Sequence, residues 1–158
     1  MKLSELKSNY EKLMKEYKLP PFKEMNENFE IEKLQDNETE MLPRNIRRLM
    51  TEKIAVILRF LEVLVNPTEN PGQIYIFSVI KSITPEAKKI IERVYKELVS
   101  IELTCLTLDI EYDEKKEIKF ILEMAKKWPS LKKDLKEITN KIGVVWEHER
   151  KSHAGYFG

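Results

Sequence analysis

Residues 42–65, LPRNIRRLMTEKIAVILRFLEVLV, decide the fold class of this 158-residue chain. Their apolar residues recur every three or four positions, which places them on one wide helical stripe, whereas a half-buried strand would alternate. Pro43 fits the first helical position, and Asn66-Pro67 ends the pattern. The stripe comprises Ile46, Leu49, Met50, Ile54, Ile57, Leu58, Leu61, Leu64 and Val65. We therefore predict a helix over 43–65.

The next segment, residues 73–83, carries signals for both helix and strand. Its run IYIFSVIKSI is rich in β-branched and aromatic residues, as a strand would be. Ile76, Val79, Ile80 and Ile83 also stand at helical spacing, and no other segment offers a partner strand. A lone strand leaves its backbone groups unpaired, so the interpretation favours a helix.

Two capping signals introduce the helices that follow. Thr84-Pro85-Glu86 combines a hydroxyl cap, a proline and an acid, and predicts a helix that runs to about Ile110. Asp113 is the candidate cap of a fifth helix, which Trp128-Pro129 should break. We predict a sixth helix over 129–142, with Gly143 as a left-handed stop and no regular period in the tail 144–158.

The N-terminal part combines a clear helix with an irregular acidic stretch. Residues 3–17 place Leu3, Leu6, Tyr10, Leu13 and Tyr17 on one stripe, and Pro20-Pro21 ends it. Residues 22–41 show no period and carry seven acids between Glu24 and Glu40. We interpret them as an extended arm, with at most one helical turn, pinned to the body by apolar side chains. Intrinsic disorder is the alternative.

Together these patterns predict an all-α protein with five to six helices, arranged as a bundle or as stacked helical hairpins. Only four glycines are present, too few for the many turns of a sandwich or barrel. Residues 49–60 and 90–101 share apolar positions at an offset of 41, which makes a HEAT-like pair an alternative. We expect one compact domain, divided into an N-terminal helix and arm (1–41), a helical core (42–143) and a tail (144–158).

Composition indicates a soluble cytoplasmic protein. The formal net charge is +1, so the overall charge gives no indication of binding to nucleic acid or to a membrane. The single cysteine, Cys105, rules out an internal disulfide and fits a reducing compartment. The apolar stretch 54–65 contains Arg59 and Glu62 and is too short to span a bilayer. Frequent Lys and Glu with two glutamines favour a thermophilic source.

One stretch resembles a known family. Residues 42–48, LPRNIRR, followed by hairpins that end in PEAKKIIERVYKELVSIE (85–102), resemble small all-helical archaeal proteins of unassigned function. The similarity covers about residues 42–102, although Leu49 and Met50 replace the small residues of that family. The resemblance implies helical hairpins and an archaeal source, and it brings no catalytic residues.

Patterns that carry catalytic or metal chemistry are weak. His148 and His153 are five residues apart, whereas the zinc-protease motif HExxH needs four to place both ligands on one face. Cys105 lies among leucines, where a buried inert thiol is the expectation, and pairing with a tail histidine is the alternative. We therefore predict a non-enzymatic protein with no cofactor, metal site or catalytic residue.

Basic side chains form two clusters that are candidate contacts for anions or nucleic acid. One cluster lies in the first turns of the helix at 43–65, and the other lies on both sides of Trp128-Pro129. The structural alternative is stronger: lysines solvate helices, and arginines at a helix start pair with acids, for which the segment 24–40 is a ready source. The candidate residues are Arg44, Arg47, Arg48, Lys126, Lys127, Lys132 and Lys133.

Apolar side chains beyond the core point to self-association. Some widen the stripe of the helix at 43–65 beyond what one neighbour can cover, and others lie in the tail. These candidates are Val56, Phe60, Val63, Trp146, Tyr156 and Phe157. The leading hypothesis is a homo-oligomeric helical interaction module that self-associates through the broad apolar faces of the helices at 43–65 and 85–110. Nucleic-acid association through the basic clusters is the alternative.

Overall fold

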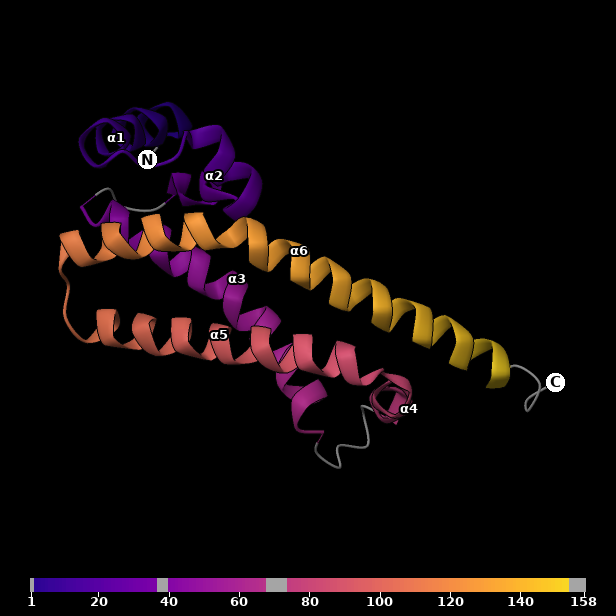
Figure 1. Ribbon diagram of the computed structural model, residues 1–158. Coiled ribbons are helices and arrows are strands. Elements are labelled where there is room, and N and C mark those ends of the chain that lie inside the picture. The colour runs from indigo at the N-terminus through magenta and orange to yellow at the C-terminus, as the bar shows by residue number, and fades with distance from the viewer. Residues whose placement is uncertain (1, 37–39, 68–73, 154–158) are drawn as a thin grey trace. The chain divides into compact units, whose positions relative to one another are not determined.

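The computed structural model describes residues 2–36, 40–67 and 74–153, and this part of the chain is all-α (Figure 1). Its seven helical segments are α1 (Leu3–Tyr17), α2 (Phe22–Phe29), the 3-10 helix η1 (Ile31–Asp36), α3 (Leu42–Val65), α4 (Ile74–Ser82), α5 (Pro85–Ile110) and α6 (Glu114–His153). No strand occurs among the described residues. The predicted fold class is confirmed.

The chain divides into two compact units, and α3, α5 and α6 each contribute to both. The first unit contains Met1–Ala55 and Ile101–Pro129, and the second contains Val56–Ser100 and Ser130–Gly158. The division falls inside helices rather than at the predicted boundaries near residues 41 and 143. Each unit has its own buried side chains and is described separately.

The N-terminal part of the first unit forms a helical layer, which corrects the prediction of an extended arm. Residues 22–36 form α2 and η1, and Met25, Phe29, Ile31 and Leu34 are buried. The prediction that apolar side chains pin this segment is confirmed, while the extended backbone and the disordered alternative are wrong. Acidic content misled the prediction, because the acids occupy the exposed side of two short helices.

Two left-handed residues turn the chain between these short helices. Lys18 and Glu30 adopt φ values of 58° and 56° and end α1 and α2. Tyr10, fully buried in α1, donates from its hydroxyl to the Pro20 carbonyl at 2.6 Å and meets the Phe22 ring edge-on. Local hydrogen bonds therefore pair backbone polar groups at the turns after α1 and α2.

The core of each unit consists of the apolar stripes that the sequence pattern indicates. In the first unit, buried residues include Ile46, Met50 and Ile54 of α3, Ile101 and Cys105 of α5, and Ile118, Ile121 and Met124 of α6. In the second unit they include Leu58 and Leu61 of α3, Ile76 and Val79 of α4, Val94 and Leu98 of α5, and Leu131 and Ile138 of α6.

Both predicted caps form, and residues 74–82 are helical as the interpretation favoured. The Ala87 N–H donates to Thr84 Oγ1 at 3.2 Å, and the Lys116 N–H donates to Asp113 Oδ1 at 3.2 Å. Each side chain satisfies one of the backbone donors that a helix start leaves without a carbonyl partner. In contrast, the N-cap residue of α1, Lys2, makes no capping hydrogen bond with its side chain.

The predicted break at Trp128-Pro129 and stop at Gly143 are both wrong, because α6 runs through both positions to His153. Proline inside a helix costs about 3 kcal/mol. Burial of Trp128 beside it in the first unit, and of Leu131 in the second, offsets that cost, while Pro129 itself is exposed. Gly143 has no positive φ. Tertiary packing therefore outweighs the local helix-breaking signals.

This placement of Gly143 gives a direct test. We expect Gly143→Ala to raise the free energy of unfolding by about 0.5–1 kcal/mol, because alanine loses less backbone entropy in a helix. The new Cβ would meet no atom within 4 Å among the described residues. Urea titration of both chains at one protein concentration measures the difference. A lower stability of the variant would indicate a left-handed stop instead.

None of the described helices is long and apolar enough to cross a membrane.

Candidate interaction surfaces

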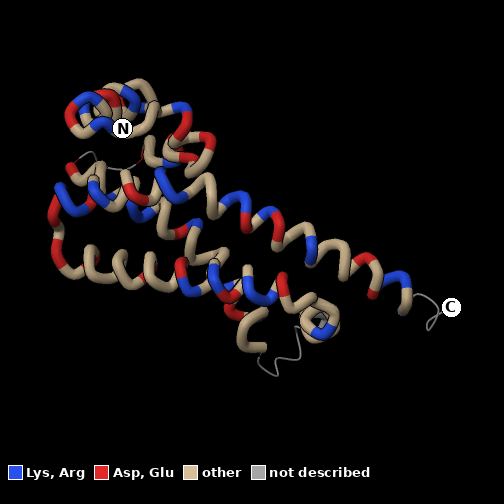
Figure 2. Tube along the Cα trace, viewed as in Figure 1, with Lys and Arg blue, Asp and Glu red and all other residues tan. Residues whose placement is uncertain are grey.

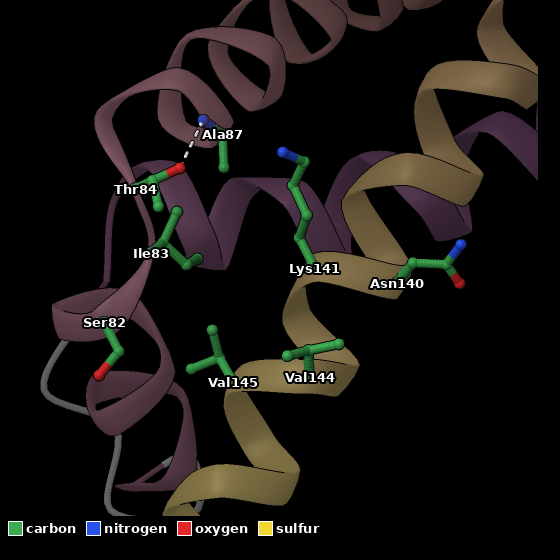
Figure 3. A pocket seen from close by; sticks show the side chains of 8 residues that line it. All are labelled: Ser82, Ile83, Thr84, Ala87, Asn140, Lys141, Val144 and Val145. Carbon is green, nitrogen blue, oxygen red and sulfur yellow. Dashed lines mark hydrogen bonds between the residues drawn. The ribbon is translucent and has the colours of Figure 1, made fainter.

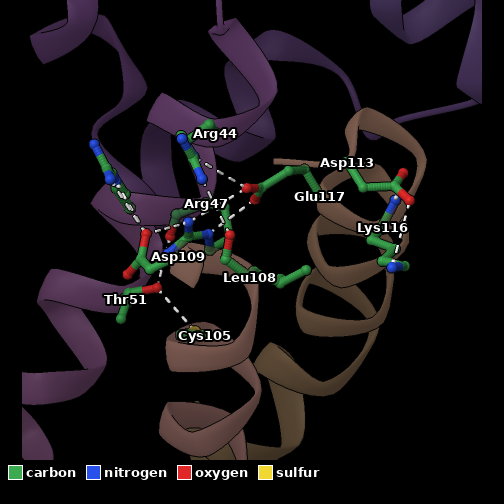
Figure 4. A network of polar contacts seen from close by, with 10 residues as sticks. Arg44, Arg47, Thr51, Cys105, Leu108, Asp109, Asp113, Lys116 and Glu117 are labelled. Atoms are coloured by element: carbon green, nitrogen blue, oxygen red, sulfur yellow. Dashed lines mark hydrogen bonds and ion pairs between the residues drawn. The ribbon is translucent and has the colours of Figure 1, made fainter. Parts of the chain in front are cut away.

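A network of charges with a buried centre joins three helices in the first unit (Figure 4). Arg47 of α3 has no exposed surface, and its Nε donates to Glu117 Oε2 of α6 at 2.8 Å. Its Nη2 donates to Asp109 Oδ1 of α5 at 2.7 Å. Glu117 is also fully buried, so the guanidinium and this carboxylate compensate each other away from water.

Two further arginines complete this arginine network, which we define as Arg44, Arg47, Arg48, Asp109 and Glu117. Arg44 Nη2 donates to the Leu108 carbonyl at 3.1 Å, and its Nε lies 3.5 Å from Glu117 Oε1. Arg48 bonds to Asp109 at 3.3 Å. Three positive charges thus meet the carboxyl end of α5, where a helix dipole favours cations.

The network shifts the ionisation of its members. Hydrogen bonds from Arg47, with its charge, hold the pKa of Asp109 below its ordinary value, although burial opposes this. Burial disfavours the charged form of Arg47, but the bonds to Glu117 and Asp109 more than offset it and raise its pKa. All three arginines are therefore held as partners of acids.

The prediction that these arginines pair with acids is thus confirmed, but the predicted source of the acids is wrong. The partners are Asp109 and Glu117 rather than the segment 24–40. Arg47 has no surface left for a phosphate, and Arg44 lies against the Tyr112 ring at 5.1 Å. Among the three predicted anion contacts of α3, Arg48 alone has an exposed side chain.

The lysine cluster is exposed but divided between the two units. Lys126 and Lys127 belong to the first unit, and Lys132 and Lys133 belong to the second. Basic and acidic positions follow each other along α6 (Figure 2), and Asp134 within this stretch pairs with Arg93 at 3.0 Å. The lysines therefore stand on a helix surface of mixed charge rather than in a purely basic patch.

Cys105 is buried, as the sequence indicates. Its Sγ lies 3.0 Å from Thr51 Oγ1, and burial raises the pKa of the thiol against the opposing effect of Thr51 and Arg47. A raised pKa leaves little thiolate at neutral pH, so the environment is unlike that of a nucleophilic cysteine. Within the described ranges, no group of three or more His, Cys, Asp and Glu side chains could hold a metal ion.

The α5 stripe is an exposed row of large aliphatic residues on a helix that the sequence predicts to self-associate, although the pattern did not single out these residues. Leu103, Leu106 and Ile110 are 59%, 57% and 87% exposed, and their spacing of three and four residues places them on one face of α5. In the sequence, Leu103 and Leu106 were interpreted as the apolar neighbours of a buried Cys105. Their spacing was the available signal, but α5 has apolar residues on more than one face.

A second apolar surface contains two of the predicted self-association residues. Phe60 of α3 and Trp146 of α6 line one groove of about 440 Å³ in the second unit, together with Val79, Thr139, Ile142 and Gly143. Phe60 is 38% and Trp146 is 40% exposed. We call this the Phe60–Trp146 groove. Val56 is exposed and Val63 is half-buried, while Tyr156 and Phe157 lie outside the described residues.

A neighbouring pocket of about 320 Å³ lies between α6 and the turn that joins α4 to α5 (Figure 3). Ile83, Ala87, Val144 and Val145 supply its apolar walls, and Lys141 stands at its rim, where it pairs with Glu137 at 3.5 Å. The other polar residues of its lining are Ser82, which donates to Glu149, Thr84, which caps α5, and Asn140.

The sequence matches no protein-family model, no curated protein and no solved structure. The resemblance over residues 42–102 stays a prediction.

Proposed function

We propose that this protein is a helical interaction module that self-associates as a two-fold dimer through the α5 stripe. The supporting observation is the exposure of Leu103, Leu106 and Ile110, all more than half open to solvent on one helix face. Large aliphatic side chains that gather on one exposed helix face are a feature of protein interfaces, whereas single exposed apolar residues are ordinary. The role of such a module is binding rather than catalysis.

A second copy is the partner that the spacing favours. Apolar residues at alternating spacings of three and four form the seam of paired helices, and such a seam matches a copy of itself. A two-fold dimer places the same patch on both subunits, so one stripe on one helix is sufficient. The aliphatic rows of two α5 helices would then cover each other without any further element.

The alternative of nucleic-acid association has less support. The arginine network uses Arg44 and Arg47 inside the first unit, and Arg48 is paired with Asp109. Binding through phosphate contacts would also fall steeply with salt, whereas an aliphatic seam gains or keeps affinity at high salt. Salt dependence therefore separates the two proposals.

Substitution of the central leucine tests the proposed dimer. We expect Leu106→Glu to weaken dimerisation at least about tenfold, because placing a charge at the centre of an interface costs about 1.4 kcal/mol or more. Sedimentation equilibrium over a range of chain concentrations measures the dissociation constant. Circular dichroism checks that the helix content is unchanged.

The matched control is Val144→Glu, which changes an aliphatic residue on α6 of the other unit that is more exposed than Leu106. Its dissociation constant should equal that of the unaltered chain. Equal dimerisation by Leu106→Glu and the unaltered chain would remove the α5 stripe from the interface.

A further inference from the structure

The α5 stripe is symmetric about its own centre. The midpoint between Leu103 and Leu106 lies between residues 104 and 105. Val99, which is half-buried one turn before Leu103 on the same continuous helix, shares this midpoint with Ile110. Two such rows that run in opposite directions therefore match along their length, with Leu103 level with Leu106 of the second copy and Val99 level with its Ile110.

The charge before this row disfavours a parallel pair. Lys96 is exposed and precedes Leu103 by seven residues, so it continues the row towards the start of α5. In a parallel pair it would stand level with Lys96 of the second copy, and facing like charges are costly. In an antiparallel pair it lies beyond Ile110 of the second copy, at the carboxyl end of that α5, where the helix dipole favours a cation.

The arginine network has one more positive charge than negative charges. Its three arginines share two carboxylates, those of Asp109 and Glu117. The outermost arginine is Arg48, whose side chain is 52% exposed and lies 3.3 Å from Asp109. A third carboxylate that reaches Arg48 from outside would balance the charge of the network.

An antiparallel pair brings Glu102 of the second copy to this point. Glu102 precedes Asp109 by seven residues, so both acids lie on the same flank of the row, about two turns apart. A two-fold axis perpendicular to both helices turns this flank towards the same flank of the other copy. About the midpoint of the row, Glu102 of one chain then stands within about 3 Å of Asp109 of the other, measured along the helix axis. Arg48 offsets the repulsion between these two acids.

We infer that the two α5 helices of the dimer run antiparallel, with Arg48 of each copy joining its own Asp109 to Glu102 of the other copy. This inference rests on the proposed self-association and names the contacts that give the dimer one orientation. The aliphatic row supplies most of the affinity, whereas exposed charge pairs contribute more to orientation and specificity.

Disulfide formation between single-cysteine variants tests the orientation. Val99→Cys and Ile110→Cys are oxidised separately and as an equilibrated mixture, and the unaltered chain, whose Cys105 is buried, is the control. We expect covalent dimers in the mixture alone. In an antiparallel pair the two copies of residue 110 are separated by eleven residues, about 16 Å along the helices, which is too far for a disulfide.

Sedimentation equilibrium of three further variants tests the ion pairs. We expect Glu102→Gln and Arg48→Met each to raise the dissociation constant of the dimer about two- to tenfold, because each removes two symmetric surface pairs. The double variant Arg48→Met/Glu102→Gln should weaken the dimer no more than the larger single change, since the same contact is lost. Glu27→Gln, an exposed acid on α2, is the control and should leave the constant unchanged.

The outcomes that overturn the inference are distinguishable from failure of the proposed dimer. Covalent dimers of Val99→Cys alone and of Ile110→Cys alone would show a parallel pair and would leave self-association intact. Additive effects of Arg48→Met and Glu102→Gln, or no effect of either, would show that these side chains do not meet across the interface. A monomeric unaltered chain would remove both proposals.

Discussion

Arg47→Met is expected to lower the free energy of unfolding by about 3–5 kcal/mol, since removing one partner of a buried ion pair leaves the other charge uncompensated. Glu117 is fully buried, and Arg47 gives it its shortest ionic contact, at 2.8 Å. The 3.5 Å contact from Arg44 Nε compensates only part of that loss. Urea denaturation at matched chain concentration measures the change, which avoids a contribution from dimerisation.

Two variants separate the buried pair from an ordinary surface pair. Arg48→Met removes a half-exposed arginine from the same carboxylate cluster and should cost less than about 1 kcal/mol. The double change Arg47→Met/Glu117→Leu should recover most of the loss, because it removes both buried charges together. A cost near zero for Arg47→Met would mean that the network is hydrated rather than buried.

Phe29→Ala is expected to lower the free energy of unfolding by about 3–5 kcal/mol, the usual cost of truncating a buried phenylalanine. Phe29 ends α2, is 3% exposed, and its ring lies 5.0 Å from that of Trp128. Lys53 stands over both rings and donates to the Asn28 carbonyl, so the end of α2 is tied to α3 and α6 within the first unit. Thermal or urea unfolding followed by circular dichroism gives the value.

Glu27→Ala is the control for this prediction. Glu27 lies on the same helix with an exposed side chain, so its replacement should change stability by less than about 0.5 kcal/mol. If residues 22–36 were an independent arm, Phe29→Ala would have an effect as small as this control.

The sequence predicts the position of a helix correctly where residues close together in the chain determine it. The bounds 3–17, the caps at Thr84 and Asp113, and the helical reading of residues 74–82 all depend on spacing or on side chains within four residues. Pro129 and Gly143 misled the prediction because the cost of each is about 1–3 kcal/mol, which burial of neighbours such as Trp128 and Leu131 exceeds.

The candidate surfaces were less predictable because they depend on contacts between distant residues. Arg47 and Glu117 are 70 positions apart, and no local pattern distinguishes Glu117 from the chain's other acids. Phe60 and Trp146 were each singled out by size and hydrophobicity, yet their meeting in one groove depends on how α3 and α6 pack in the second unit. The helix α5 has apolar residues on more than one face, and packing against other helices decides which face is buried. The exposed face, with Leu103, Leu106 and Ile110, could therefore not be identified from the sequence.

The mass of the unaltered chain in solution, by light scattering on a size-exclusion column with absorbance at 260 and 280 nm, tests the central claim most directly. We expect twice the chain mass of 18.8 kDa at micromolar concentration, in low and high salt, without excess absorbance at 260 nm. A mass of 18.8 kDa at every concentration would contradict self-association, and a peak that carries nucleic acid only at low salt would favour the basic clusters instead.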